Sequence, residues 1–89
     1  MEKFHDLLVA NTQFPTVYLH KFIGKNSTIF AMGVADFEKK FIGLTKVTER
    51  KSATGKHLAL TYEYQAESAK DVVNLALQTH LIHDLIYIL

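Results

Sequence analysis

A chain of 89 residues has room for one domain, and a 48% hydrophobic content with a mean hydropathy of +0.05 is typical of a globular fold rather than a disordered segment. Ten basic residues against nine acidic ones give a net charge of +1, so the chain as a whole lacks the concentrated basic charge of nonspecific nucleic-acid binding. The sequence contains no cysteine, which excludes disulfides, thiolate nucleophiles and thiolate metal ligands.

Residues 1–13 form an N-terminal arm, and residues 14–89 form the domain itself. Within the arm, residues 2–10 predict a short helix, which is marginal unless it docks on the domain. Its apolar side chains are Phe4, Leu7 and Leu8. The apolar run is too short for a signal peptide, and no stretch approaches the ~20 apolar residues of a membrane span, so we expect a cytoplasmic protein.

The first strand and helix are predicted from two different periodicities. Residues 16–23 alternate in the manner of a strand, whereas residues 27–41 repeat at helical spacing. The apolar stripe of this helix consists of Phe30, Val34, Phe37 and Phe41. Asn26 or Ser27 is suited to cap the helix N-terminus, and Gly43 to end the helix in a left-handed conformation.

The second half of the chain repeats this order after a hairpin. Residues 44–50 and 57–66 predict two strands joined by the turn 51–56, in which Gly55 is free to adopt positive φ. Residues 68–79 predict a helix that begins at a serine cap, and residues 84–89 predict the last strand. The inward side of that helix carries Val72, Leu75, Ala76 and Thr79.

The resulting order is strand, helix, strand, strand, helix, strand. Two right-handed βαβ units joined by a hairpin predict an α+β ferredoxin-like βαββαβ sandwich. Its sheet has four antiparallel strands in the order 4-1-3-2, and both helices cover the same face.

Strand alternation divides the side chains between the two faces of this sheet. The helix-covered face is predicted to carry Tyr18, His20, Phe22, Leu58, Leu60, Tyr62, Tyr64, Leu85, Tyr87 and Leu89. The open face is predicted to carry Val17, Leu19, Ile23, Ala59, Ile86 and Ile88, with Val47 from the second strand. Open faces of antiparallel sheets are normally polar, and an exposed apolar patch usually marks an interface. Two alternatives stay open: the N-terminal arm covers this face, or a one-residue slip in register exchanges the faces.

The turn at residues 24–28 lies between a strand and a helix, as phosphate-binding loops do. It lacks the upstream glycine of a P-loop, and Asn26 separates Lys25 from Ser27, so an ordinary cap and turn is the main interpretation and weak anion binding the alternative. The candidate contacts for a small ligand in this turn are Gly24, Asn26 and Ser27.

No motif in the chain predicts catalysis, a metal site or a cofactor. His80 and His83 have the spacing of paired ligands, but zinc sites want three or four, so we interpret them as surface histidines. We interpret His20 as a hydrogen-bonded core residue. The hairpin at residues 50–57 is the most basic segment, and its interpretations are a solvated turn or a phosphate or nucleic-acid contact.

Several short features together resemble the YbeD-like family of small bacterial proteins, which are of unknown function and sometimes labelled lipoate regulatory proteins. These are Phe14-Pro15-Thr16, Tyr18, Lys21, Gly24, Arg50-x-Ser52-x-x-Gly55 and Thr61. The chain departs from the family at His57, where a tyrosine is expected, at Ala59, where a serine is expected, and in its longer N-terminal arm. The resemblance implies a fold similar to the ACT regulatory domain, whose members often pair and bind small metabolites at the pairing interface; it implies no catalytic residues.

These observations favour a non-enzymatic regulatory or interaction module that forms a homodimer or binds a protein partner through the open face. The alternative is an ACT-like sensor of a small metabolite. An RNA-binding module is the third and least favoured alternative, because RNA-binding sheets expose aromatic residues, and the aromatic residues of this sheet are predicted on the covered face.

Overall fold

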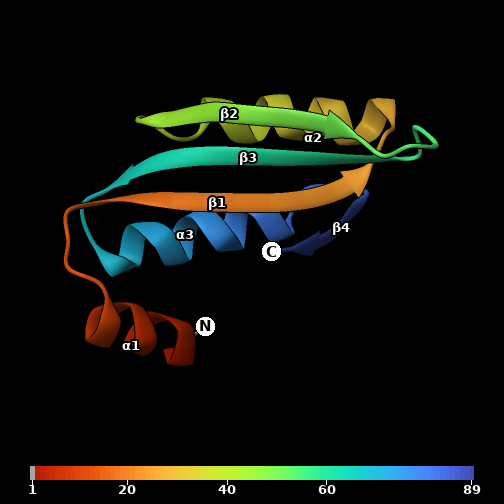
Figure 1. The fold of residues 1–89 in the computed structure, drawn as a ribbon. Coiled ribbons are helices and arrows are strands. Elements are labelled where there is room, and N and C mark those ends of the chain that lie inside the picture. Colours follow the sequence, from red (N-terminus) through yellow and green to blue (C-terminus); the bar gives the residue numbers. More distant parts are fainter. Residues whose placement is uncertain (1) are drawn as a thin grey trace.

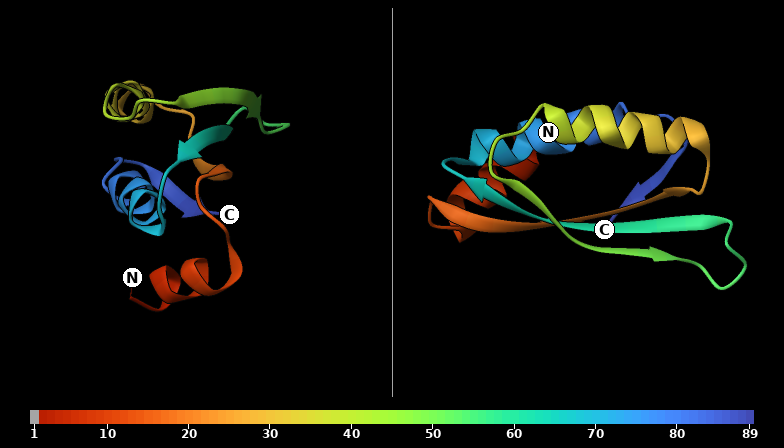
Figure 2. Two further views of the ribbon diagram at one scale, coloured as in Figure 1. Left: turned by 90° about the vertical axis from the view of Figure 1, so that its left-hand side faces the viewer. Right: turned by 90° about the horizontal axis from the view of Figure 1, so that it is seen from above.

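The computed structural model describes residues 2–89 as three α-helices and one four-stranded antiparallel sheet (Figure 1). In chain order the elements are α1 (Glu2–Asn11), β1 (Thr16–Lys25), α2 (Thr28–Lys39), β2 (Leu44–Lys51), β3 (His57–Ala66), α3 (Ala69–His80) and β4 (Leu85–Ile88). The strands lie in the order β2-β3-β1-β4, which confirms the predicted order. Within the described chain, α2 and α3 cover one face of the sheet and leave the other face open (Figure 2).

The ends of the elements differ slightly from the predicted ones. β1 continues past Gly24 because β3 pairs with it as far as Lys25 and His57. α2 ends at Lys39, earlier than predicted. Gly43 adopts positive φ (81°), but it lies in the turn that leads into β2 rather than at the end of the helix. None of the three described helices combines the length and the apolar composition that a membrane crossing needs.

Both α2 and α3 begin at a serine cap. The Ser27 Oγ accepts a hydrogen bond from the Phe30 N–H (3.1 Å), and the Ser68 Oγ accepts one from the Asp71 N–H (3.4 Å). Each cap satisfies a backbone donor that the first helical turn leaves without a partner. The buried residues then recur at helical spacing, with Phe30, Val34 and Phe37 on α2 and Ala69, Val72, Leu75, Ala76 and Thr79 on α3.

Aromatic rings from β1, α2 and β3 form the centre of the core. Phe22 stacks on Tyr62 with ring centroids 5.7 Å apart and planes at 9°. Phe37 meets both rings edge-on, at 5.7 Å and 5.9 Å. Such pairs each add about 0.5–1.5 kcal/mol beyond the burial of their area. This cluster holds α2 on the sheet and thereby determines which face remains open.

The N-terminal helix α1 packs against α3 and not on the open face (Figures 1 and 2). Leu8 is buried in the core and Phe4 packs against it, whereas Leu7 is 62% exposed. The arm therefore docks on the domain through two of its three apolar residues. The alternative in which the arm covers the open face is wrong.

Candidate functional site

The open face of the sheet is aliphatic along the first half of β1. Alternation places Val17 and Leu19 on this face, with exposed fractions of 53% and 64%. Their partners on β3 are the polar Gln65 and Glu63. Two neighbouring branched aliphatics on one face of a strand form a small apolar surface that water covers in the isolated chain.

The prediction for the last strand is wrong at Tyr87 and Ile88, and Leu89 is exposed as well, because β4 pairs with β1 through an irregularity. Phe22 pairs with Ile88 and Ile23 pairs with Tyr87, but Gly24 pairs with Leu85, so the register shifts between Ile23 and Gly24. The extra residue of a bulge interrupts the alternation of faces. Ile88 therefore lies on the helix-covered side and packs against the core, and Tyr87 lies on the open face with 49% of its surface exposed.

The rest of the predicted open-face set divides into two groups. Ile23 and Ala59 pair directly, and Ile86 is 44% exposed beside them, as predicted. Val47 is the extra residue of a second irregularity, between Lys46 and Thr48, and lies on the edge strand β2. Val47 is 49% exposed, yet β3 separates it from the aliphatic residues of β1. Leu89, which was predicted to face the helices, is 60% exposed.

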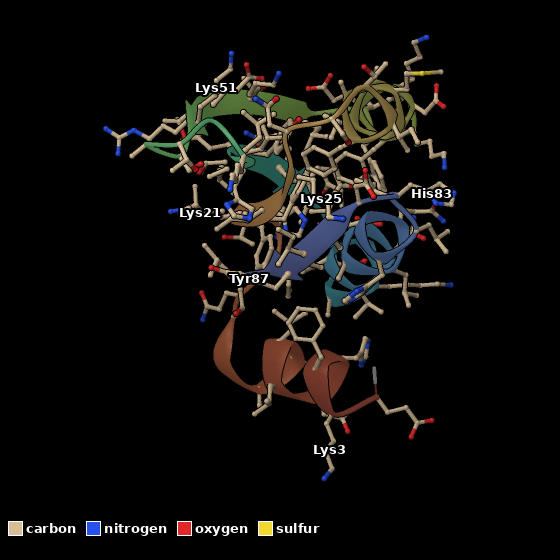
Figure 3. The ribbon with its side chains drawn as sticks, turned by 90° about the vertical axis from the view of Figure 1, so that its right-hand side faces the viewer. Lys3, Lys21, Lys25, Lys51, His83 and Tyr87 are labelled. Atoms are coloured by element: carbon tan, nitrogen blue, oxygen red, sulfur yellow. The ribbon has the colours of Figure 1, made fainter. Side chains whose placement is uncertain are left out.

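The end of the open face next to the β2–β3 hairpin is cationic. The register aligns one residue from each strand in a row across the sheet: Arg50, Ala59, Ile23 and Tyr87. Lys21 lies on the same face of β1, and Figure 3 shows its side chain pointing away from the helices. Beside the row is a hollow of about 280 Å³, lined by Ile23, Ser52, His57, Ile86 and Tyr87. The basic character of this hairpin was predicted from the sequence, but the aromatic ring of Tyr87 beside it was not.

The predicted ligand turn brings Gly24, Asn26 and Ser27 together, but their groups already serve the fold. The Ser27 Oγ donates to the Asp84 Oδ2 (2.7 Å), besides capping α2. The Asn26 Nδ2 donates to the Gly55 carbonyl (2.9 Å). A Cβ at Gly24 would collide with the ring of Phe30. Through these two hydrogen bonds, the turn joins β1 to the hairpin and to the start of β4.

His20 is a buried, hydrogen-bonded core residue, as predicted. Its Nε2 lies 2.8 Å from the Thr79 Oγ1, and the Thr79 hydroxyl donates its own proton to the Leu75 carbonyl (2.7 Å). Thr79 must then accept from the imidazole, which assigns the proton of neutral His20 to Nε2. Burial, with the nearby His80 as a smaller cause, lowers the pKa of His20 from 6.5 to about 4. The ring is 2% exposed and is therefore poorly placed to act as a base on any substrate.

A second polar cluster lies between α2 and β2. The Tyr62 hydroxyl donates to the Glu38 Oε2 (2.7 Å), and the Lys46 Nζ lies 3.6 Å from the same oxygen and 3.0 Å from the Glu49 Oε1. Burial, and then the bond to Glu38, raises the pKa of Tyr62. The hydrogen bond to Glu49 raises the pKa of Lys46. The one cation, Lys46, lies between the two carboxylates, so the cluster holds the edge strand β2 against α2 rather than forming a reactive centre.

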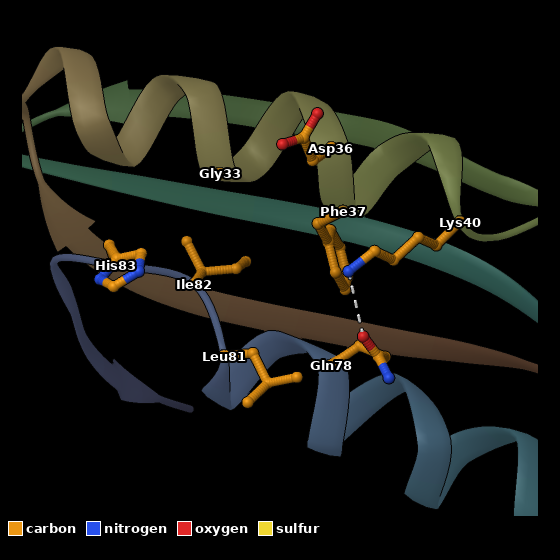
Figure 4. Close-up of a pocket in the computed structure, with 8 residues that line it drawn as sticks. All are labelled: Gly33, Asp36, Phe37, Lys40, Gln78, Leu81, Ile82 and His83. Carbon is orange, nitrogen blue, oxygen red and sulfur yellow. Dashed lines mark hydrogen bonds between the residues drawn. The ribbon is translucent and has the colours of Figure 1, made fainter.

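A groove runs between α2 and α3 on the helix side of the molecule (Figure 4). The Lys40 Nζ donates to the Gln78 Oε1 across it (3.2 Å). A Cβ at Gly33 would lie only 3.0 Å from the Ile82 Cγ2, so the two walls approach closely. The groove holds about 150 Å³, well below the ~300–1,000 Å³ of typical ligand pockets. We interpret it as the seam between two packed helices.

The two C-terminal histidines do not share a helical face. His80 is the last residue of α3, and His83 lies in the turn before β4. Within residues 2–89, no three His, Asp or Glu side chains gather as a metal site would require.

The model of the family described as "Protein of unknown function (DUF493)" matches residues 10–89. The chain belongs to the DUF493 family. The DUF493 region contains α2, α3 and all four described strands, whereas most of α1 precedes it. No curated protein and no solved structure matches the chain.

Proposed function

We propose that this DUF493 chain is a non-enzymatic, cytoplasmic regulatory or interaction module that associates through its open sheet face, with a second copy of itself or with a protein partner. The observation that carries the proposal is the pair Val17 and Leu19, which is aliphatic, exposed and uncovered by α1. Because Tyr87 lies on the open face and Ile88 does not, the proposed interface includes Tyr87 in place of Ile88. Its members are then Val17, Leu19, Ile23, Ala59, Ile86 and Tyr87, with Val47 at the periphery.

The size of the open face is compatible with a specific interface. β1 and β3 each contain 10 residues, and the sheet has four strands. At ~3.3 Å per residue and ~4.8 Å per strand, the face covers on the order of 500 Å². Two such faces bury roughly 1,000 Å², which is the lower bound for a biological interface.

The finer architecture is also part of the proposal. The order of the elements and the strand order β2-β3-β1-β4 support a ferredoxin-like arrangement, similar to the ACT domain and to YbeD-like proteins. Because one fold serves many functions, this analogy supports the architecture alone, and the function is argued from the surface.

The alternative, an ACT-like sensor of a small metabolite, has less support. Its candidate contacts Asn26 and Ser27 already donate to Gly55 and Asp84, so a ligand would have to replace two bonds that hold the turn. A thermal-shift panel of amino acids and cofactors tests this alternative, since a ligand at ~100 times its Kd adds about 2.7 kcal/mol of stability.

A matched pair of variants tests the association. Leu19→Glu places a charge on the open face, and Leu81→Glu places the same charge on an equally exposed leucine of the helix side, since the two exposed fractions are 64% and 67%. Loss of association with Leu19→Glu alone supports the proposal, and equal association of the two variants rejects it. Ile88→Glu is unsuitable, because Ile88 packs against the core and the variant would unfold the chain for an unrelated reason.

A further inference from the structure

The hairpin end of the open face combines cations that have no counter-charge. Lys21 and Arg50 make no ion pair among the described residues, in which only His5 and Lys46 pair with carboxylates. His57 lies at the same end, where it pairs with Lys25. Glu63 is the acidic residue of β3 on this face; it pairs with Leu19, lies diagonal to Lys21 without an ion pair to it, and is four residues along β3 from the partner of Arg50. A cluster of one sign that the fold does not neutralise attracts an oppositely charged ligand.

The same end exposes one aromatic ring next to a hollow. Tyr87 lies on the side of the sheet away from α2 and α3, as does Lys21 (Figure 3). The ring is 49% exposed, and it forms one wall of the hollow of about 280 Å³, whose floor contains Ile23. An exposed tyrosine over an aliphatic floor is a stacking surface for a flat ring.

The spacing of these groups sets the kind of ligand that fits. Tyr87 and Arg50 are the two ends of the four-residue row and lie three strands apart, which is about 14 Å between Cα atoms. Ala59 lies between them, and its short side chain rises less above the sheet than the side chains at the two ends of the row. Arginine binds phosphate through two parallel N–H bonds, and lysine adds a point charge. A ligand with a flat ring at one end and phosphate at the other spans this distance.

We infer that the hairpin end of the open face is a nucleotide-binding site, in which the base lies in the hollow against Tyr87 and the phosphates lie between Arg50 and Lys21. Free nucleotides and single-stranded RNA share this chemistry. The sequence argued against a nucleic acid because the aromatic residues were predicted on the covered face. The bulge of β4 reverses that argument for Tyr87.

The binding test uses four probes with the full chain at low salt: ATP, tripolyphosphate, adenosine and an eight-nucleotide oligouridylate. Calorimetry or NMR titration measures the small probes, and fluorescence anisotropy measures the RNA. We expect ATP to bind more tightly than either tripolyphosphate or adenosine, because each of these offers half of the contacts. Affinity should fall as salt rises, since the phosphate contacts are electrostatic. If ATP and the RNA bind with equal affinity, the ligand is a free nucleotide. If the RNA binds more tightly than ATP, the ligand is a single strand. Both results support the site.

Three variants assign the binding to this surface. Arg50→Gln should weaken ATP by about tenfold or more, the expected effect of losing a charge-assisted bond. Tyr87→Leu should weaken ATP while leaving tripolyphosphate unchanged. Lys39→Gln removes an exposed cation from the last turn of α2, on the other side of the molecule, and should change nothing. Absence of binding by both ATP and RNA, or equal effects of Arg50→Gln and Lys39→Gln, overturns the inference.

The site shares Ile23, Ala59 and Tyr87 with the association surface proposed above, so the two proposals are separated by variants. Leu19 lies two residues from Lys21 on the same face, so Val17→Glu, at the far end of β1, is the variant that should disrupt association and leave ATP binding intact. A chain that binds ATP but does not associate supports the site and rejects the association, and the reverse result rejects the site alone.

Discussion

His20 makes the stability of this DUF493 chain depend on pH in a narrow, mildly acidic range. Its imidazole is enclosed by Phe22 and Phe37, with ring centroids at 5.5 Å and 6.4 Å, and donates to Thr79. The fold stabilises the neutral ring and lowers its pKa to about 4, mainly by burial and secondarily through His80. In the unfolded chain the ordinary value of 6.5 applies. Between these two values the unfolded state therefore binds more protons than the folded state.

The size and sign of the effect follow from linkage. The contribution of His20 is fully present above pH 6.5 and is lost as the pH falls toward about 4. At 1.36 kcal/mol per pKa unit, the free energy of unfolding drops by about 3 kcal/mol across this range. A domain of this size has a total stability on the order of 5–10 kcal/mol, so the loss is a large part of it.

The assay is urea unfolding at a series of pH values from 7.5 to 4, for the wild type and for His20→Gln. Glutamine keeps an N–H donor for Thr79 but does not titrate in this range. We expect the wild type to lose about 3 kcal/mol more than the variant between pH 7 and pH 4. Other titrating groups contribute to both proteins and cancel in the difference. Equal slopes for the two proteins would refute the argument, because they would mean that His20 accepts a proton as easily in the fold as outside it.

Two further substitutions test contacts that hold the open face in place. Gly24→Ala should cost about 1–3 kcal/mol, because the new Cβ overlaps the buried ring of Phe30; the cost should shrink in a Phe30→Leu background, and an unchanged cost there would contradict the overlap. Tyr62→Phe should cost about 1 kcal/mol, because Glu38 loses one hydrogen bond while keeping Lys46; a cost near zero in urea unfolding would show that water replaces the hydroxyl without loss.

The element order and the strand order could be predicted because periodicity, caps and turn residues agree along the whole chain. Ser27 and Ser68 both cap the helices that the pattern predicted. His20 was predicted in the core because strand alternation places it between Tyr18 and Phe22. Local rules of this kind are sufficient wherever each strand alternates without interruption.

The candidate site could be predicted only in part, because two bulges decide which side chains it exposes. The irregularity at Gly24 exchanges Tyr87 and Ile88, and the one beside Val47 shifts the second half of β2. A bulge depends on how two strands fit together, and neither strand reveals it alone. The hydrogen bonds of Asn26 to Gly55 and of Ser27 to Asp84 join residues far apart in the chain. No local pattern could therefore predict that this turn holds the hairpin and the start of β4 in place.

The central claim is that the open sheet face is an association surface, and the absolute mass in solution tests it most directly. Light scattering after size exclusion, over a dilution series, should show the wild type and Leu81→Glu at the mass of a dimer that dissociates on dilution. Leu19→Glu should elute as a folded monomer of 10.1 kDa, with the circular dichroism of the wild type. A wild type that is monomeric at every concentration, or a Leu19→Glu variant that stays dimeric, would contradict self-association through this face.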